Sequence, residues 1–198
     1  MALKVIQKIN GRLKFLWRKH KFFTPPLKRL LCNALIQLHF DYASSAWYQN
    51  LHKKLSDKLQ ICQNKCIRFC LSLGNRSHIG ISEFKEINWL PVRARFGQNV
   101  TTHIFMQQNK LAPKYMDEMF TSADQCNIKT RSSSNKHLHP NCNRVSVYMA
   151  ISFLGPKLWN KLPIETRTST NPNSVKHQVK MHFFKAFAKE NDDCFVYY

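Results

Sequence analysis

The amino-acid sequence predicts a mainly α-helical fold, in which a helical bundle is followed by a loop-rich segment and a terminal helix. Apolar residues recur at every third or fourth position over long stretches, which is the period of one face of a helix. Helix start and stop signals bound several of these stretches. With 198 residues, 43% hydrophobic and 12% aromatic, the chain is long enough to bury a core and too apolar for a disordered basic tail.

The first helix is predicted over residues 4–20. Its apolar side carries residues at helical spacing, namely Ile6, Ile9, Leu13, Leu16 and Trp17. Its opposite side carries Lys4, Lys8, Arg12 and Lys19. This pattern predicts an amphipathic helix with a basic outer face.

A second helix is predicted to begin at Thr24-Pro25-Pro26. Threonine caps a first turn well, and proline lacks only an N–H that has no partner at that position. The apolar stripe that follows has a nearly perfect helical period and consists of Leu27, Leu30, Leu31, Ala34, Leu35, Leu38 and Tyr42. We therefore predict a core helix that buries this stripe and reaches towards Trp47.

A third helix is predicted from about Lys53 to Leu73, where Gly74-Asn75 is typical of a left-handed C-terminal cap. One side of it is lined by Leu55, Leu59, Cys62, Cys66, Cys70 and Leu73. Another side is lined by Lys54, Lys58, Lys65 and Arg68. The third helix thus repeats the amphipathic, basic character of the first.

Shorter helices are predicted before residue 121. Ser82 can cap one that ends at about Glu86, and Pro91 opens a longer one that ends at about Asn109. Ala112-Pro113 begins a further helix of one or two turns.

The composition changes at about residue 121. We therefore predict a basic helical domain over residues 1–120 and a loop-rich extension over residues 121–198. Residues 121–147 are rich in Ser, Asn, Thr and His, and they predict a loop with room for a short strand. Beyond them, Gly155-Pro156 predicts a turn, and an amphipathic helix is predicted over about residues 174–189.

The charge is strongly positive and unevenly placed. The chain has 31 Lys and Arg against 11 Asp and Glu, a net charge of +20, and residues 1–70 carry 14 of the cations and only two carboxylates. A solvated helix face normally mixes both signs, so this imbalance favours a polyanion, bound through its phosphates without sequence readout. The predicted contact residues are Lys4, Lys8, Arg12, Lys19, Lys28, Lys54, Lys58, Lys65 and Arg68.

Cellular location is predicted from what the sequence lacks. No run of apolar residues reaches the length of a membrane span, and the N-terminus does not resemble a secretory signal. The seven cysteines are an odd number, which disfavours a disulfide framework. We therefore expect an intracellular protein with reduced thiols, in the nucleus and cytoplasm, that has no membrane partner.

Two groups of cysteines, one of them with histidines, contain the side-chain types that bind zinc. Cys62, Cys66 and Cys70 lie four apart, so their sulfurs would spread over roughly 12 Å of helix, too far to share one zinc. We interpret them as small core residues. A more tempting zinc candidate lies in the polar segment and consists of Cys126, His137, His139 and Cys142. It lacks the paired spacing of known zinc fingers, so no metal or other cofactor is predicted.

Independent catalysis is not predicted. The sequence contains no Gly-x-Ser-x-Gly, no phosphate-binding glycine loop and only five glycines. Asp192-Asp193 is an adjacent acidic pair, but we interpret it as part of a solvated tail.

Several ordered blocks of sequence carry a family resemblance. They are Lys8-Ile9-Asn10 onward to Leu16; His39-Phe40-Asp41-Tyr42-Ala43; Ala46-Trp47-Tyr48; Leu59 to Arg68; Asn88-Trp89-Leu90-Pro91-Val92 with Arg95; Thr130-Arg131-Ser132; Gly155 to Pro163; and Lys176-His177. In this order the chain resembles the C-terminal end of a LINE-type, jockey-like non-LTR retrotransposon reverse transcriptase.

The resemblance implies a fold and a function. In this family the stretch forms the thumb and a C-terminal extension, and the thumb holds the template–primer duplex through its phosphates. The parent enzyme is an RNA-directed DNA polymerase that uses Mg²⁺ in its palm. The Tyr-x-Asp-Asp strand of the palm does not occur in this sequence, so no catalytic residue of the family can be assigned.

Two hypotheses follow. The first is a non-catalytic fragment that binds RNA, an RNA–DNA hybrid or a DNA duplex without sequence specificity. The second is an inactive structural relic that packed on a palm domain and has no function of its own.

Overall fold

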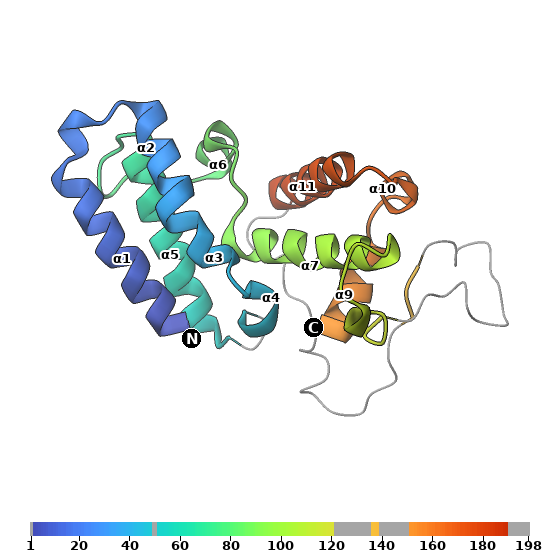
Figure 1. The fold of residues 1–198 in the computed structure, drawn as a ribbon. Helices are drawn as coiled ribbons and strands as arrows, with labels where there is room; N and C mark the ends of the chain where they lie inside the picture. The colour runs from blue at the N-terminus through green and yellow to red at the C-terminus, as the bar shows by residue number, and fades with distance from the viewer. Residues whose placement is uncertain (1, 49–50, 121–135, 139–150, 190–198) are drawn as a thin grey trace, which may run out of the picture. The chain divides into compact units, whose positions relative to one another are not determined.

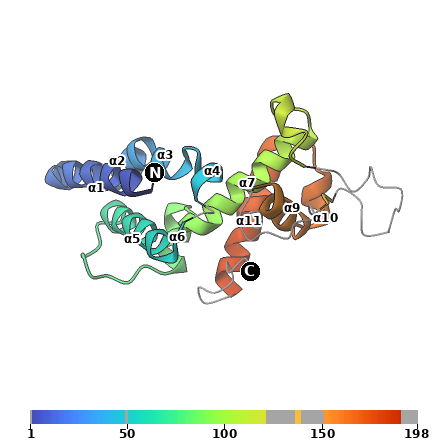
Figure 2. The same cartoon turned by 90° about the horizontal axis from the view of Figure 1, so that it is seen from below.

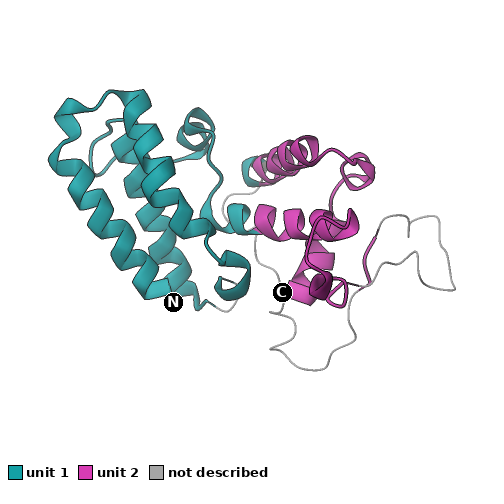
Figure 3. Cartoon of the chain, in the orientation of Figure 1, with its two compact units in different colours: residues 1–96, 187–198 teal, residues 97–186 magenta. Residues whose placement is uncertain are grey.

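The computed structural model describes four stretches of the chain, residues 2–48, 51–120, 136–138 and 151–189. These residues are mainly helical, which confirms the predicted fold class (Figure 1). The chain divides into two compact units, residues 1–96 with 187–198 and residues 97–186 (Figure 3). The domain boundary that composition indicates near residue 120 stays a prediction.

Three helical runs of the first unit lie side by side and alternate in direction (Figures 1 and 2). Two of them are α1 (Ala2–Arg18) and α5 (Lys53–Cys70). Between them in sequence, α2 (Pro25–Cys32), the wide π-helical turn η2 (Asn33–Gln37) and α3 (Leu38–Asp41) follow without a break, and we name this run helix 25–41. Because α5 packs against both α1 and α2, the three form a bundle.

α1 buries the face that the sequence predicts. Ile9, Leu13 and Leu16 are no more than 4% exposed. α5 does the same with its own apolar side, where Leu59 and Cys66 are fully buried. In both helices the hydrophobic period identified the core face correctly.

Helix 25–41 buries a different face from the predicted one. The exposed fractions of Leu30, Leu38 and Tyr42 are 63%, 61% and 71%. The residues that it buries are instead Lys28, Cys32, Ile36, Gln37 and Phe40. The helix is present, but the prediction that its leucine stripe forms the core is wrong.

Small side chains explain why this face is the buried one. Sγ of Cys70 on α5 lies 3.8 Å from the carbonyl oxygen of Lys28, so the two helices approach closely there. Cys32 is fully buried, and its interaction with the neighbouring Cys70 raises the pKa of its thiol. Leucine side chains at these positions would hold the two helices further apart.

The wide turn η2 adjusts the period of the buried face. Four residues of the buried face are spaced four apart, a longer repeat than the 3.6 residues of an α-helix: Lys28, Cys32, Ile36 and Phe40. The turn is fixed from outside, because Arg12 Nη1 donates a hydrogen bond to the carbonyl oxygen of Leu35 at 2.5 Å.

α5 ends at Cys70 rather than at the predicted Leu73. The N–H of Leu73 donates to the Arg68 carbonyl at 2.9 Å, and the N–H of Ser72 donates to the Phe69 carbonyl at 3.3 Å. This pair of bonds is a Schellman motif, with Ser72 in the left-handed region at a φ of 56°. The left-handed residue is therefore Ser72, and the prediction of Gly74 is wrong.

Short elements complete the first unit. η1 (His20–Phe22) follows α1, and α4 (Ser44–Trp47) follows helix 25–41 after Ala43, which has a φ of 50°. These turns reverse the chain between the long helices.

α6 (Ile81–Ile87) follows α5. Its N-terminal cap is Gly80, because the Glu83 carboxylate accepts a hydrogen bond from the Gly80 N–H at 2.7 Å. The prediction that Ser82 caps this helix is wrong, since Ser82 lies inside it and donates its hydroxyl to the same carboxylate.

The second unit contains most of α7 (Val92–Gln108), which begins directly after Pro91 as predicted. η3 (Lys114–Met116), α9 (Ile151–Asn160), α10 (Ile164–Thr168) and α11 (Pro172–Lys189) follow. Gly97 allows α7 and α11 to approach closely, because a Cβ there would lie 2.7 Å from Cζ of Phe183.

The prediction of a turn at Gly155-Pro156 is wrong, because α9 continues through both residues. A Cβ on Gly155 would lie 2.9 Å from side-chain atoms of both Ile104 and Phe120. Close packing at this glycine, with Leu158 and Trp159 buried beside it, offsets the hydrogen bond that proline removes from the helix.

No helix in the described part of the chain combines the length and the apolar character that crossing a membrane requires.

Candidate nucleic-acid interface

α5 presents a stripe of cations to solvent. Lys54, Lys58 and Lys65 are exposed and Arg68 is half-buried, and their spacing of four, seven and three residues keeps them on one side of the helix. The stripe extends over roughly 21 Å at 1.5 Å per residue. Asp57 is the one carboxylate of α5, and Ile61, 52% exposed, lies within the stripe.

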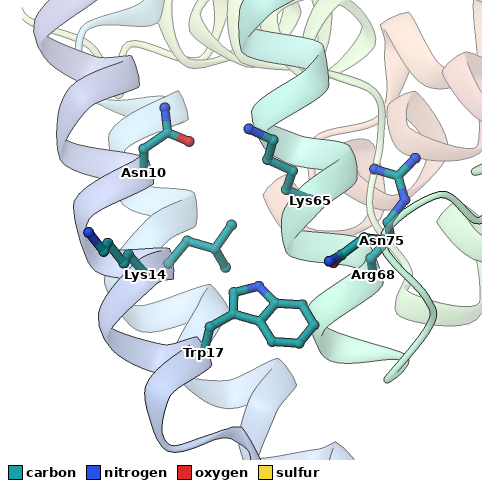
Figure 4. A pocket seen from close by; sticks show the side chains of 7 residues that line it. Asn10, Lys14, Trp17, Lys65, Arg68 and Asn75 are labelled. Carbon is teal, nitrogen blue, oxygen red and sulfur yellow. The ribbon is translucent and has the colours of Figure 1, made fainter.

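One end of this stripe borders a pocket between α1 and α5 (Figure 4). The pocket has a volume of about 350 Å³. It is lined by Asn10, Leu13, Lys14 and Trp17 of α1, by Lys65 and Arg68 of α5, and by Asn75 of the following loop.

The cations of the pocket lack acidic partners. Three positively charged side chains line it and no carboxylate does. Lys14 and Lys65 form no hydrogen bond or ion pair within the described residues. Arg68 donates from Nε to the carbonyl oxygen of Ser77 at 2.9 Å, which orients its guanidinium. An anion in the pocket would offset the repulsion among these three groups.

Trp17 adds an aromatic surface to this cationic pocket. Its indole is partly exposed and lines the pocket from the α1 side (Figure 4). The ring packs edge-on against the buried Phe69, with 5.4 Å between the ring centroids. An aromatic ring beside cations is the combination that proteins use to bind single-stranded nucleic acids.

The two carboxylates of the first 70 residues are not part of the pocket. Asp41 accepts two hydrogen bonds from Arg95, at 2.5 Å from Nε and 2.6 Å from Nη2. This bidentate pair neutralises Asp41. Asp57 is exposed on the N-terminal half of α5.

The other predicted cations of α1 do not line this pocket. Lys4, Lys8, Arg12 and Lys19 are all exposed. Arg12 donates its hydrogen bond to the Leu35 carbonyl of helix 25–41. The pKa of His39 on that helix is lowered by burial and by the positive charges of Arg12 and Lys8. Of the predicted contact residues, Lys65 and Arg68 line the pocket.

Lys28 does not belong to any solvent-exposed surface. Its side chain is only 6% exposed, its ammonium donates to the Ser72 hydroxyl at 2.7 Å, and it lies 5.6 Å from the centroid of the Phe69 ring. Because its ammonium is buried and held in this way, we do not include Lys28 in the candidate interface. The buried face of helix 25–41 requires small or flexible side chains, and the long lysine stem fills that space.

Five pocket residues are not among the predicted ligand contacts: Asn10, Leu13, Lys14, Trp17 and Asn75. Lys14 lies three residues before Trp17, so both occupy one side of α1, and this spacing could have paired them. Trp17 was assigned to the core, where only part of its ring lies. Asn75 carries no sequence signal, because its position depends on how the loop after α5 folds back.

The cysteines of the bundle are core residues, as interpreted from their spacing. Cys32, Cys62, Cys66 and Cys70 are all buried and free. Burial raises the pKa of the Cys66 thiol, and a hydrogen bond with Cys70 together with burial raises that of Cys32. These thiols are therefore protonated at neutral pH and are poor nucleophiles.

The zinc candidate falls mostly outside the described residues, since Cys126, His139 and Cys142 are not among them. His137 is described and is 3% exposed between the rings of Phe120 and Trp159, with centroid distances of 6.1 and 6.4 Å. Its backbone exchanges two hydrogen bonds with the amide of Asn160, at 3.0 and 2.8 Å. Within the described residues, no group of three potential ligands could hold a metal ion.

Comparisons of the chain with protein families, with curated proteins and with solved structures found no match.

Proposed function

We propose that this chain is a non-catalytic, nucleic-acid-binding part of a retrotransposon RNA-directed DNA polymerase. It binds RNA or an RNA–DNA template–primer through the phosphates. The observation that carries the proposal is the α1–α5 pocket, which collects Lys14, Lys65 and Arg68 without a carboxylate.

The charge arrangement supports phosphate binding on physical grounds. Folding places these three cations on the lining of one pocket, and no acidic group of that lining compensates them. A polynucleotide offsets this repulsion and releases its condensed counterions in return. The α5 stripe extends the cationic surface over roughly 21 Å, the length of about six nucleotide steps at 3.4 Å each. Binding of this kind needs no cofactor and gives no sequence specificity.

The proposal is tested by the salt dependence of binding. The purified 198-residue chain is titrated into a fluorescently labelled RNA–DNA hybrid, and the dissociation constant is measured by anisotropy between 50 and 200 mM salt. A protein with several phosphate contacts should lose ~10³-fold or more in affinity over this range. Affinity that does not change with salt would contradict the proposal.

Charge-reversal variants locate the surface. Lys58→Glu combined with Lys65→Glu should abolish binding at 150 mM salt. The matched control is Lys110→Glu with Lys114→Glu, which makes the same change of net charge at exposed positions in the other compact unit. If the control weakens binding as much as the α5 variant, total charge rather than this surface is responsible.

The polymerase assignment depends on the sequence blocks, above all Leu59 to Arg68 and Gly155 to Pro163. It is tested by the genomic reading frame upstream of Met1, where an in-frame palm with its Asp-Asp strand is expected. A different domain there would contradict it. Primer extension by the purified chain would contradict the non-catalytic part of the proposal.

One observation favours the second hypothesis, a structural role on a palm domain. Leu27, Leu30, Leu38 and Tyr42 leave an apolar face of helix 25–41 in solvent, and such a face is typical of a covered surface. If this role is correct, the isolated chain should bind an apolar fluorescent dye and aggregate, while showing no salt-dependent affinity for nucleic acid. The binding titration above therefore separates the two hypotheses.

A further inference from the structure

We propose that the α1–α5 pocket binds one unpaired nucleotide of a polynucleotide, with its base on the indole of Trp17 and phosphates of the strand at the cations. This inference rests on the proposed phosphate binding and makes it more specific. In a duplex the bases are paired and stacked on each other, so a ring on the protein surface cannot reach their faces. The pocket therefore selects single strands, or unpaired ends of duplexes.

The position of Trp17 suits a stacking platform. One side of the indole is anchored, because it lies edge-on to the fully buried Phe69 and 5.4 Å from the ring of His20. His20 is fixed in turn, with Nδ1 2.7 Å from the carbonyl oxygen of Trp17. The part of the indole that lines the pocket is thus held in place before any base arrives, which lowers the entropic cost of binding.

Cations line the pocket from two helices, so a bound strand can reach them with more than one of its phosphates. Lys14 extends from α1, and Lys65 and Arg68 extend from α5 on the other side of the pocket (Figure 4). Both lysines are without a hydrogen-bond partner in the described residues, and the Nη atoms of Arg68 form no hydrogen bond there either. Guanidinium and ammonium groups form the strongest class of hydrogen bonds to phosphate.

Two amides supply polar contacts without base selection. Asn10 and Asn75 line the pocket from α1 and from the loop after α5. An amide offers both a donor and an acceptor, so it can pair with the edge of any base. Oδ1 of Asn10 already accepts from the Cys62 thiol at 3.7 Å, so Asn10 contributes mainly its donor. The volume of about 350 Å³ lies at the small end of the range of ligand pockets, which fits one nucleotide rather than several.

Substitution of the indole tests this inference in the full chain. We expect Trp17→Leu to weaken binding of a labelled 12-nucleotide single strand about tenfold and to leave a 12-base-pair duplex within twofold. The matched control is Trp47→Leu, because Trp47 is also partly exposed in the first unit and its Nε1 donates to the Tyr42 carbonyl outside the pocket. The control should leave both affinities unchanged.

The outcomes separate the inference from the proposed function. Equal losses on single strand and duplex, or no loss on either, would overturn the nucleotide pocket and leave phosphate binding intact. If neither substrate binds the unsubstituted chain with salt dependence, the proposed function fails and the inference fails with it.

Photo-crosslinking tests the same inference without a substitution that could affect folding. A single strand that carries 5-iodouracil is irradiated with the unsubstituted chain, and the crosslinked residue is identified by mass spectrometry. Base stacking places the crosslink on Trp17, and excess unlabelled single strand should compete it away. Crosslinks found only on other residues would overturn the inference.

Discussion

α1 and helix 25–41 are both amphipathic, yet they relate to the core in opposite ways. The regular apolar stripe of α1 is buried, with Ile9 fully enclosed. The equally regular stripe of helix 25–41 is in solvent, and the helix buries a face that includes Lys28 and Ile36. Periodicity thus identifies a helix and an apolar face, but packing decides which face meets the rest of the chain. Close contact at Cys32 and Cys70 decides it here.

The largest expected effect comes from truncating the two buried faces. Ile9→Ala and Ile36→Ala should each lower the free energy of unfolding by about 2–5 kcal/mol, because both side chains are fully buried and leave a cavity. Urea denaturation measures this. Leu30 is 63% exposed, so Leu30→Ala should lower the free energy of unfolding much less than Ile36→Ala. Equal losses would contradict the assignment of the buried and exposed faces of helix 25–41.

A pH titration examines the buried face of helix 25–41 without creating a cavity. The pKa values of Cys32 and Cys66 are raised in the folded chain, so both thiols stay protonated while unfolded thiols ionise above about pH 8.5. The contribution of these thiols to the free energy of unfolding is therefore fully present below that pH. Above it, the free energy of unfolding falls by at most about 1.4 kcal/mol per pH unit for each thiol. Denaturation between pH 8 and 9.5 measures the slope. Cys32→Ala should lower this slope without removing it, because burial also raises the pKa of Cys62.

Lys28 and Lys65 should behave differently, although both are lysines of the same bundle. Lys65→Met should reduce the slope of log affinity against log salt by about one, because an exposed phosphate contact is lost. Lys28→Met should leave that slope unchanged and alter the free energy of unfolding by less than about 1 kcal/mol, since methionine fills the space of a poorly compensated buried charge. If the two variants had the same slope of log affinity against log salt, the expected difference would be contradicted. Both lysines would then contact phosphate, or neither would.

The smallest effect is expected on the exposed stripe. Leu30→Gln and Leu38→Gln should each change the free energy of unfolding by less than about 0.5 kcal/mol, as surface substitutions usually do. Binding of an apolar fluorescent dye to the folded chain should fall in the double variant. Unfolding of that variant at ordinary temperature would show that the stripe is part of the core after all.

Much of the fold could be predicted because the signals are local. The helix start at Pro91 and the buried faces of α1 and α5 depend on residues within one or two turns of each other. The exposed face of helix 25–41 could not be predicted, since burial there depends on side chains of α5 some 40 residues later. The turn predicted at Gly155-Pro156 is wrong for the same reason. The packing of Gly155 on Ile104 and Phe120 is a long-range contact, and it keeps the helix continuous.

The candidate site was predicted in part. Lys65 and Arg68 were identified from charge and helical spacing, and both line the pocket. Lys14 and Trp17 were assigned to the right helix but not to a site, because a pocket exists only once two helices are packed. Asn75 depends on the loop after α5, and the buried position of Lys28 depends on the same loop.

The bond between Lys28 and Ser72 has a consequence for binding kinetics. Ser72 and Ser77 bracket the residue that completes the pocket, Asn75, and they are tied by Lys28 and Arg68. A loop restrained at both ends has fewer conformations to search when a ligand arrives. In the proposed nucleotide pocket, Lys28 would therefore act by restraining this loop rather than by its charge. Loss of Lys28 should slow association while leaving the electrostatic attraction unchanged.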